Sequence, residues 1–312
     1  MVPERFYADD MRREISTGEL RWIHITDPKE GDLQFLREEL GFHALDVEEC
    51  RRPSLRPKVE SHPEYLFLVV HAPTHLREER ATLPAEFDVF VTPNTLVTVH
   101  AASASHLDGF FRDVSTNDDL KTRVVGRDTA YLLYRILDHL FETAFPMLDH
   151  ITEHLTEVEK KIFTGHERQM VSELSLIQRD LTGFRSIVRP QRHLYEAGTL
   201  HGSWNSPAVA VVFRSVHGKL TRLWDHLETL WERAEALAET NAVLVNYKLN
   251  EFVKILTVLG AFFIPLGLIG QTAVFIHGGI PLLNRLVFLG IICVMLLVVY
   301  VVLWNAKKRK IL

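Results

Sequence analysis

Cysteine is scarce in this sequence: its 312 residues include only Cys50 and Cys293. Two cysteines so far apart argue against a disulfide framework and against a zinc site built from thiolates. The first sixteen residues, MVPERFYADDMRREIS, also lack the apolar core of a secretory signal peptide. We therefore expect the amino-terminal part of the chain in the cytoplasm.

Acidic residues are nearly absent from the last part of the chain. After position 247 there are seven basic residues and a single acid, Glu251. The whole chain has 35 basic and 40 acidic residues, so residues 1–247 hold 28 and 39, a net charge of −11. An acidic domain argues against nucleic acid as a partner, because phosphates are bound by clustered Lys and Arg. It is compatible with cations as partners.

Two stretches near the carboxyl terminus contain no charged residue at all, residues 255–276 and residues 286–304. Each is long enough, as a helix, to cross about 30 Å of hydrocarbon. The short connection between them predicts two antiparallel spans. The basic residues 307–310 (KKRK) then mark the cytoplasmic side by the positive-inside rule. We predict a multi-pass protein of a bacterial-type inner (plasma) membrane, with both termini in the cytoplasm.

Residues 1–125 alternate between strand and helix patterns. The predicted strands are 21–26 (RWIHIT), 65–71 (YLFLVVH), 87–91 and 95–100, and the predicted helix is 32–40. Pro93-Asn94, between the last two strands, is typical of a hairpin turn. This part is therefore predicted to be a cytoplasmic α/β domain around a small sheet.

After residue 126 apolar residues recur at spacings of three and four, which is the period of a helix. Long helices are predicted at 127–163, at 167–195, and from about 208 onward with no stop signal before the first charge-free stretch. The predicted parts of the chain are an α/β domain at 1–125, a helical stalk at 126–250, two transmembrane helices at 251–306 and a basic cytoplasmic tail at 307–312.

Three separated segments resemble the CorA metal-ion transporter family. Residues 56–60 (RPKVE) followed by 65–67 (YLF) look like that family's RPKVE…YLF strand entry. Residues 93–100 (PNTLVTVH) are similar to its PNxLVTVH hairpin, and residues 250–257 (NEFVKILT) with Pro265-Leu266 resemble the NxxMKxLT…PL start of its first span. The segments occur in the family's order and extend over essentially the whole chain.

The resemblance implies an α+β membrane protein that forms a funnel-shaped homopentamer. Each subunit would have a cytoplasmic α/β domain, long stalk helices and two carboxyl-terminal transmembrane helices. The central pore would pass divalent cations, with Mg²⁺, Zn²⁺ and Co²⁺ as candidates, and a divalent cation would be the only ligand, transported or regulatory. The expected partners are other copies of the chain, membrane lipid and divalent cations, and no enzyme activity is expected. The sequence assigns no metal ligands.

One departure from the family concerns the outer end of the first span. The family has a Gly-Met-Asn signature there, usually preceded by Tyr, and counting from Pro265 places Ala273, Val274, Phe275 and Ile276 at these positions. Val274, Phe275 and Ile276 are therefore degenerate filter positions. The outer loop follows with His277, Gly278, Gly279 and Pro281, which resembles the GGIP of the ZntB-like branch. These features suggest a divergent subgroup that resembles CmaX.

A stripe along the stalk and first span is predicted to face the pore, because parallel helices turn residues at alternating spacings of three and four toward their common axis. The predicted pore-lining residues are Glu239, Asn246, Asn250, Val253, Thr257, Gly260, Ile264, Gly267 and Gln271. Asn250, Thr257 and Gln271 offer neutral oxygens to a hydrated cation. The alternative role for such residues is hydrogen bonding between helices.

Other interpretations stay open at this point. Without the signature, the chain could be a CorA-like scaffold or sensor, or a pore for other solutes, that does not transport divalent cations efficiently. Residues 150–154 (HITEH) match H-x-x-E-H, a pattern of some zinc proteases. Their neighbours are charged, as on a solvated helix face, which argues against catalysis.

Overall fold

The computed structural model describes residues 12–52, 54, 56–76, 81–196 and 206–277, with isolated positions at 290, 293, 297 and 300. The chain divides into two compact units, Met1–Thr240 and Asn241–Leu312. The first unit holds a sheet, seven helices and the beginning of an eighth helix. The described part of the second unit is mainly the continuation of that eighth helix.

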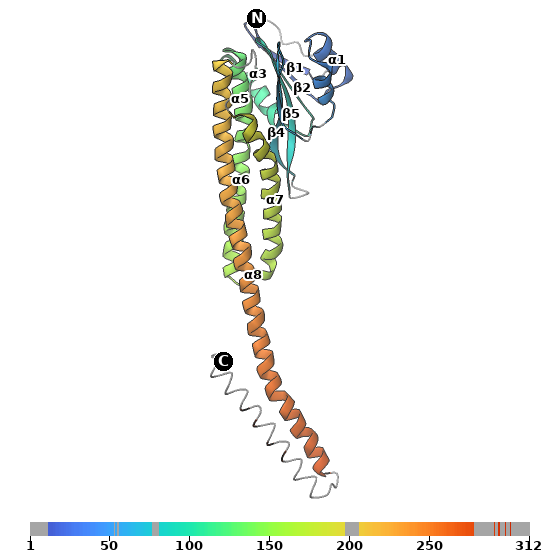
Figure 1. The fold of residues 1–312 in the computed structure, drawn as a ribbon, viewed down its shortest axis with the longest axis vertical. Coiled ribbons are helices and arrows are strands. Elements are labelled where there is room, and N and C mark those ends of the chain that lie inside the picture. The colour runs from blue at the N-terminus through green and yellow to red at the C-terminus, as the bar shows by residue number, and fades with distance from the viewer. Residues whose placement is uncertain are drawn as a thin grey trace. The chain divides into compact units, whose positions relative to one another are not determined.

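A six-stranded mixed sheet forms the centre of the first unit (Figure 1). Its strands are β1 (Arg12–Thr17), β2 (Leu20–Thr26), β3 (Lys58–Ser61), β4 (Leu66–Leu76), β5 (Ala81–Val91) and β6 (Thr95–His100). Their order across the sheet is β1-β2-β6-β5-β4-β3. All neighbouring strands are antiparallel except β2 and β6, which run parallel.

The predicted strands are confirmed at β2, β4, β5 and β6, and two further strands, β1 and β3, were missed. Both lie at the sheet's edges and are short and rich in charge (RREIST and KVES), so they lack a clear apolar alternation. Strands β4 and β5 also extend past Pro73 and Pro84, which resemble boundaries in the sequence. These two prolines face each other. The backbone N–H of His71, two residues before Pro73, points away from β5 toward Gln191, so the Pro73 nitrogen also points away and the β4–β5 ladder loses no donor at this pair.

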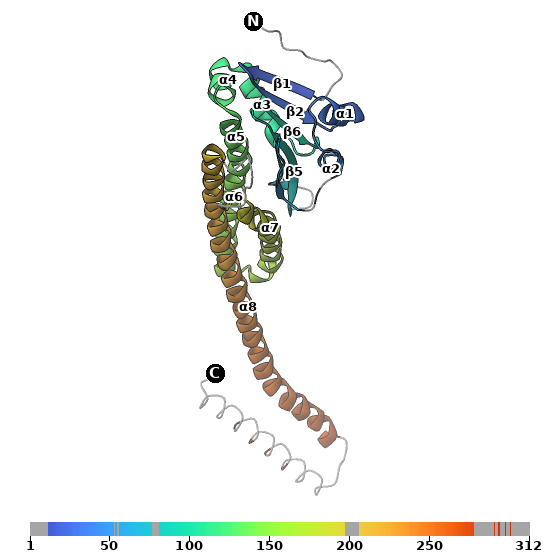
Figure 2. The same ribbon diagram turned by 45° about the horizontal axis from the view of Figure 1, so that its top comes forward.

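Helices α1 (Glu30–Glu38) and α2 (Ala44–Glu49) cover one face of the sheet (Figure 2). Leu33 and Leu36 of α1 pack into a buried cluster with alternate strand residues. That cluster consists of Ile23, Ile25, Leu33, Leu36, Phe42, Val47, Tyr65, Phe67, Val69, Phe90, Val97 and Val99. The period of two along each strand therefore places residues 22, 24 and 98 on the opposite face.

The opposite face is covered by the helices that follow the sheet (Figure 2). They are α3 (His106–Thr116), α4 (Asp118–Val125), α5 (Thr129–Glu142), α6 (Ala144–Phe163) and α7 (Glu167–Leu194). Helix α7 approaches β5 so closely that a Cβ on Gly183 would lie 2.4 Å from the carbonyl oxygen of Thr82. Glycine is therefore required at this crossing.

The predicted helix 127–163 is wrong in one respect, because it is broken at Thr143 into α5 and α6. Pro146 explains the position of the break. It lies in the first turn of α6, where the backbone N–H groups have no partner within the helix. A helix that begins just before the proline accommodates it without the loss of a backbone hydrogen bond.

Helix α8 (Pro207–His277) is 71 residues long, as expected from the missing stop signal. In the first unit it buries one seam at alternating spacings of three and four. The seam consists of Val209, Phe213, Val216, Leu220, Leu223, Leu227, Leu230, Ala234 and Leu237. Lys219, which is 8% exposed, forms ion pairs with Asp138 and Glu142 of α5. Apolar burial and these ion pairs hold α8 to its own domain.

Within the part of the chain that the structure describes, no helix combines the length and the apolar character of a membrane span. The predicted run 286–304 lies outside the described residues except for four isolated positions. The predicted run 255–276 falls within α8, and most side chains after residue 265 are outside the description. The two membrane spans stay predictions.

Candidate functional site

The predicted pore stripe lies along α8. Wherever its side chains are described, they are exposed in a single copy of the chain, with Gly260 half-buried. The exposed members are Glu239, Asn246, Asn250, Val253, Thr257, Ile264 and Gly267. Glu239 is two residues beyond Leu237 of the buried seam, or about 200° further around a helix of 3.6 residues per turn. It therefore points away from the domain that the seam contacts.

Among the polar stripe residues, Thr257 has a defined hydrogen bond. Its hydroxyl donates over 2.8 Å to the carbonyl oxygen of Val253, which lies in the preceding turn of the helix. The hydroxyl hydrogen is therefore occupied, and the lone pairs of the oxygen remain available as acceptors. This arrangement suits a group that faces a cation or its water shell.

The predicted filter and outer loop fall at the edge of the described chain. Gln271, Val274, Phe275, Ile276 and His277 belong to α8, but their side chains are not described. Gly278, Gly279 and Pro281 lie outside the described residues. Their predicted roles stay predictions.

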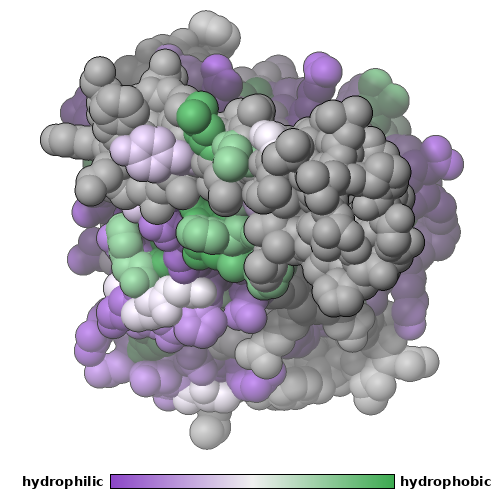
Figure 3. Space-filling model, turned by 90° about the horizontal axis from the view of Figure 1, so that it is seen from below, coloured by the Kyte–Doolittle hydropathy of each residue, from purple (hydrophilic) through white to green (hydrophobic). Residues whose placement is uncertain are grey.

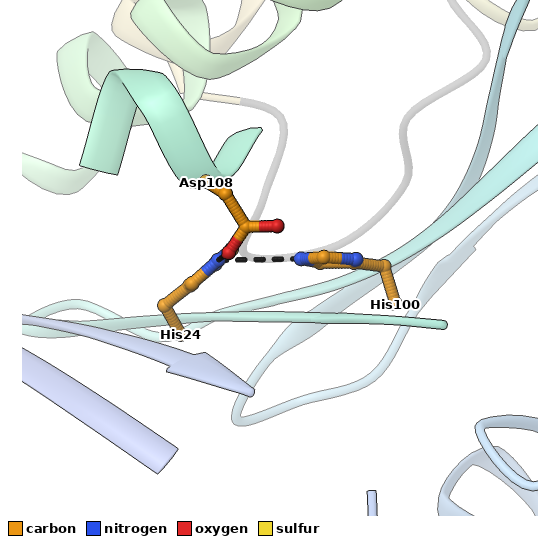
Figure 4. A group of neighbouring side chains, drawn as sticks. All are labelled: His24, His100 and Asp108. Carbon is orange, nitrogen blue, oxygen red and sulfur yellow. Dashed lines mark hydrogen bonds and ion pairs between the residues drawn. The ribbon is translucent and has the colours of Figure 1, made fainter. Parts of the chain in front are cut away.

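A second candidate site lies in the first unit, where β2, β6 and α3 bring together His24, His100 and Asp108 (Figure 4). His24 Nε2 is 3.2 Å from His100 Nε2 and 3.4 Å from Asp108 Oδ1. The parallel pairing of β2 with β6 sets Thr26 opposite His100 and His24 opposite Thr98. The two imidazoles therefore emerge on the same face, beneath the first turn of α3.

The other nitrogen of each imidazole is also engaged. His24 Nδ1 lies 2.8 Å from Thr98 Oγ1, and His100 Nδ1 lies 2.8 Å from the carbonyl oxygen of Ala101. A carbonyl can only accept, so His100 carries its proton on Nδ1 and leaves Nε2 with a lone pair. Trp22 Nε1 donates to the same Thr98 hydroxyl over 3.1 Å. These contacts orient both Nε2 atoms toward Asp108.

The electrostatics of this cluster keep both imidazoles neutral. Burial lowers the pKa of His24 to about 4, and it also lowers the pKa of His100. The pKa of Asp108 is well below its usual range because His24 and Arg13 donate to the carboxylate. Arg13 forms an ion pair with Asp108 Oδ1 at the edge of the cluster, with 32% of its side chain exposed. The cluster therefore offers two neutral imidazoles and one carboxylate at neutral pH.

A third group, Asp46, Glu60 and His62, is also close enough to share an ion. His62 Nε2 is 2.9 Å from Asp46 Oδ2, and the hydroxyl of Tyr65 donates to the same carboxylate oxygen over 2.5 Å. Glu60 is 4.0 Å from His62 and accepts a bond from Lys58 instead. Its members are largely committed to one another and to Lys58, so this group is a weaker candidate for a metal.

A cavity of about 370 Å³ lies beside the middle of β4 and β5 and the carboxyl end of β6. Its lining includes Cys50, His71, Glu86, Asp88 and His100. Asp88 is 3% exposed, and its Oδ1 accepts no hydrogen bond from the described residues. Burial and the nearby Glu86 raise the pKa of Asp88, and burial raises the pKa of the Cys50 thiol. The cavity and the cluster share His100, at the end of β6.

Sequence reasoning missed the cluster of His24, His100 and Asp108. Both histidines stand in predicted strands, at 21–26 and 95–100, and each strand has its histidine at or near the carboxyl end. That position was the available signal, since the carboxyl ends of parallel strands meet at one edge of a sheet. The hairpin of strand 95–100 with strand 87–91 gave no sign that strand 21–26 pairs in parallel with the other edge of 95–100. In the H-x-x-E-H segment, the exposed His150 lies 3.7 Å from Glu153. His154 pairs instead with Glu173 of α7 at 3.3 Å, so the two histidines have different partners.

The described chain combines an α/β domain with a helix of 71 residues that begins in this domain and extends beyond it. A family model described as CorA-like Mg²⁺ transporter protein matches residues 17–308. The chain belongs to this family. The resemblance seen in residues 56–60, 93–100 and 250–257 is thereby confirmed, as is the expectation of a transporter rather than an enzyme.

Three similar proteins show how far the likeness extends. The cobalt/magnesium transport protein CorA of Thermotoga maritima is 25% identical over 251 residues, which cover 78% of this chain and 70% of that protein. The structure of the CorA magnesium transporter from Methanocaldococcus jannaschii has a TM-score of 0.70 at 21% identity and covers 92% of each chain. The full-length CmaX protein has a TM-score of 0.69 at 17% identity, covering 93% of this chain and 88% of its own. At these identities the two structures establish the fold.

Proposed function

We propose that this chain transports divalent cations as a homopentamer, with the ions passing along an axis lined by α8. The observation that carries the proposal is the orientation of α8 in the first unit. Its apolar seam is buried against its own domain, while Glu239, on the other side of the helix, is exposed. The polar stripe continues from Glu239 through Asn250 and Thr257, so copies of α8 set side by side can turn it toward a common axis.

The apolar surface of α8 supports a membrane location for this part of the chain. Large apolar residues between 252 and 264 are 46–65% exposed in one copy. At about 100° per residue they spread over more than half of the helix circumference. They are Phe252, Val253, Ile255, Leu256, Leu259, Phe262, Phe263 and Ile264. Apolar (green) residues are open to view on the face drawn in Figure 3. Lipid and neighbouring copies would cover such a surface in an inner membrane, with both termini in the cytoplasm.

The stripe residues would have different roles in this pore. Asn250, Thr257 and Gln271 would form rings of neutral oxygens that bind the water shell of Mg²⁺, Co²⁺ or Zn²⁺. Val253 and Ile264 would form apolar constrictions that can close by excluding water. Glu239 would place a ring of carboxylates at the cytoplasmic end, where it would concentrate cations. Gly260 and Gly267 would leave space in the bore.

The test is uptake of Mg²⁺, Co²⁺ and Zn²⁺ by liposomes that contain the purified protein and a trapped metal-sensitive dye. Asn250→Leu should reduce the flux at least about tenfold, since losing a ring of hydrogen bonds costs 1 kcal/mol or more per site in a low-dielectric pore. Leu249→Ala, one residue away and off the stripe, is the matched control and should leave the flux unchanged. Equal loss of flux in both variants would contradict the assignment of the stripe.

A second function is favoured by one specific observation, the hydrocarbon side chains at 274–276 in place of the family's signature. A chain of this family without that filter could serve as a pentameric scaffold or sensor, or as a pore for other solutes. Mass measurement of the detergent-solubilised complex separates these possibilities from a failure to assemble. A pentamer without divalent flux would support the scaffold, and a pentamer that releases uncharged dyes would support the pore for other solutes. A monomer as the only species would remove every pore role proposed here.

A further inference from the structure

We propose that His24, His100 and Asp108 form a binding site for a transition-metal cation of the Zn²⁺ or Co²⁺ class inside the α/β domain. The site is separate from the pore stripe on α8 and lies within one subunit. It does not depend on whether the chain transports ions.

The spacing of the three donor atoms fits a tetrahedral ion. Nitrogen and oxygen ligands about 2.0–2.1 Å from zinc stand about 3.3 Å from one another at the corners of a tetrahedron. The two edges that meet at His24 Nε2 measure 3.2 Å to His100 Nε2 and 3.4 Å to Asp108 Oδ1. All three atoms lie within 4.8 Å of one another. Only the third distance, between His100 and Asp108, must therefore shorten for an ion to bind. Thr26 Oγ1, 3.5 Å from His100 Nε2, or a water supplies the fourth corner.

The surroundings of the imidazoles match those of metal-bound histidines. A metal-ligating histidine usually donates its other ring N–H to a fixed oxygen, which holds the ring and makes the free nitrogen more basic. The carbonyl of Ala101 already accepts from His100 Nδ1, and the Thr98 hydroxyl stands at the same distance from His24 Nδ1. In the described arrangement His24 donates from Nε2 to Asp108, so binding of an ion would require its proton to move to Nδ1, where Thr98 Oγ1 can accept it. Both Nε2 atoms would then offer lone pairs to the space between the rings in Figure 4.

Ligand chemistry selects the class of ion. Two neutral imidazoles and one carboxylate suit Zn²⁺ and Co²⁺, whereas Mg²⁺ prefers oxygen ligands and keeps most of its water. His100 is the one member of the site that also lines the polar cavity.

Arg13 would compete with a metal ion for the carboxylate of Asp108. Without a metal it pairs with Asp108 Oδ1, and its Nη2 is also 3.4 Å from Thr26 Oγ1. A divalent ion would therefore have to displace the guanidinium, which is partly exposed and can turn into solvent. A purely structural polar network would be weakened by loss of Arg13, whereas a metal site would be strengthened by it. The two interpretations thus predict opposite effects of one substitution.

The experiment is titration of the full-length, detergent-solubilised protein with Co²⁺, followed by visible absorption. Tetrahedral Co²⁺ with nitrogen ligands absorbs far more strongly than the hydrated octahedral ion that a pore would hold, so the signal reports this site. We expect a strong band that saturates at one ion per chain, that Zn²⁺ removes and that Mg²⁺ does not. His100→Gln and Asp108→Asn should abolish it. His139→Gln, which alters another partly buried histidine on the same face, should keep it.

Arg13→Met gives the second measurement and is expected to tighten Co²⁺ binding about tenfold, the effect of removing roughly 1.4 kcal/mol of competition. Circular dichroism and gel filtration identify variants that fail to fold. A band that persists in folded His100→Gln overturns the proposal. So does the absence of a band in both wild type and folded Arg13→Met. Either result leaves the liposome flux untouched, so failure here is distinct from failure of the transport function.

Discussion

The side-chain amide of Gln191 makes both hydrogen bonds that a neighbouring strand would make with His71. The backbone N–H of His71 donates to Gln191 Oε1 over 3.0 Å, and Gln191 Nε2 donates to the carbonyl oxygen of His71 over 2.6 Å. Strand β3 pairs with β4 only up to Val69, so the backbone of His71 has no strand partner on that side. One buried side chain of α7 thus closes the edge of the sheet and joins it to the helices.

Gln191→Leu should therefore lower the free energy of unfolding by about 2–3 kcal/mol, because two buried backbone groups lose their partners at once. Thermal unfolding followed by circular dichroism measures the loss. Gln169→Leu is the matched control, since Gln169 lies exposed on the same helix. A change of less than about 0.5 kcal/mol in both variants would show that water satisfies the edge of β4 equally well.

Asp88→Asn should stabilise the protein above about pH 4, with a gain that grows as the pH rises. Burial and Glu86 raise the pKa of Asp88 in the folded state. Between the unfolded and folded pKa values the folded state binds more protons, so wild-type stability falls with rising pH. The amide of the variant does not ionise, so its stability does not fall in this way as the pH rises. Melting temperatures measured across this pH range should diverge in favour of the variant.

The control for this experiment is Asp149→Asn, which changes an exposed aspartate of α6. In this variant the difference in melting temperature between acidic and neutral pH should be the same as in the wild type. If Asp88→Asn instead melts lower than the wild type at neutral pH, the ionised carboxylate has a partner that stabilises it. A cation in the polar cavity would be such a partner.

Asn250→Cys should form disulfides between copies of the chain and react with small water-soluble thiol reagents, because position 250 is proposed to face the axis. Phe262 lies off the stripe and is 58% exposed in one copy. Phe262→Cys should form no disulfides between copies across the axis and should not react with reagents that enter the pore. Both are made in a background without the native Cys50 and Cys293. Gel electrophoresis under non-reducing conditions gives the result. Equal labelling at both positions would show that the stripe is placed wrongly.

Restoring the family's signature should sharpen ion selectivity. The variant combines Ala273→Tyr, Val274→Gly, Phe275→Met and Ile276→Asn. A pore entrance selects a hydrated cation by offering oxygens to its water shell, and Val274, Phe275 and Ile276 offer none from their side chains. Mg²⁺ uptake by liposomes should then saturate at lower concentration and exclude competing ions better than in the wild type.

Wild type and the four-residue variant are compared side by side in this assay. Absence of divalent flux in properly assembled pentamers of both would remove the transporter function and favour the scaffold. Flux that is equally unselective in both would show that selection depends on residues other than 273–276.

Local patterns were enough to predict much of the architecture. Alternating apolar residues at 21–26 and 95–100 predicted strands that form, and the missing stop signal after residue 208 predicted the continuity of α8. The family resemblance rested on short segments whose residues are adjacent in the chain. In each case the determining interactions lie between residues that are close in the chain. The local pattern of apolar residues is therefore enough to predict the helix or strand.

The contacts that make the sites come from residues far apart in the chain. His24 meets His100 because β2 and β6 pair in parallel across 76 positions, and Gln191 reaches His71 across 120. The extension of β4 and β5 past Pro73 and Pro84 depends on those prolines meeting each other. Such pairings are decided by which faces bury together and which backbone groups still need partners. The sequence alone thus determined the family and the elements with a clear apolar period, and only the tertiary structure decided the edge strands and which side chains share a site.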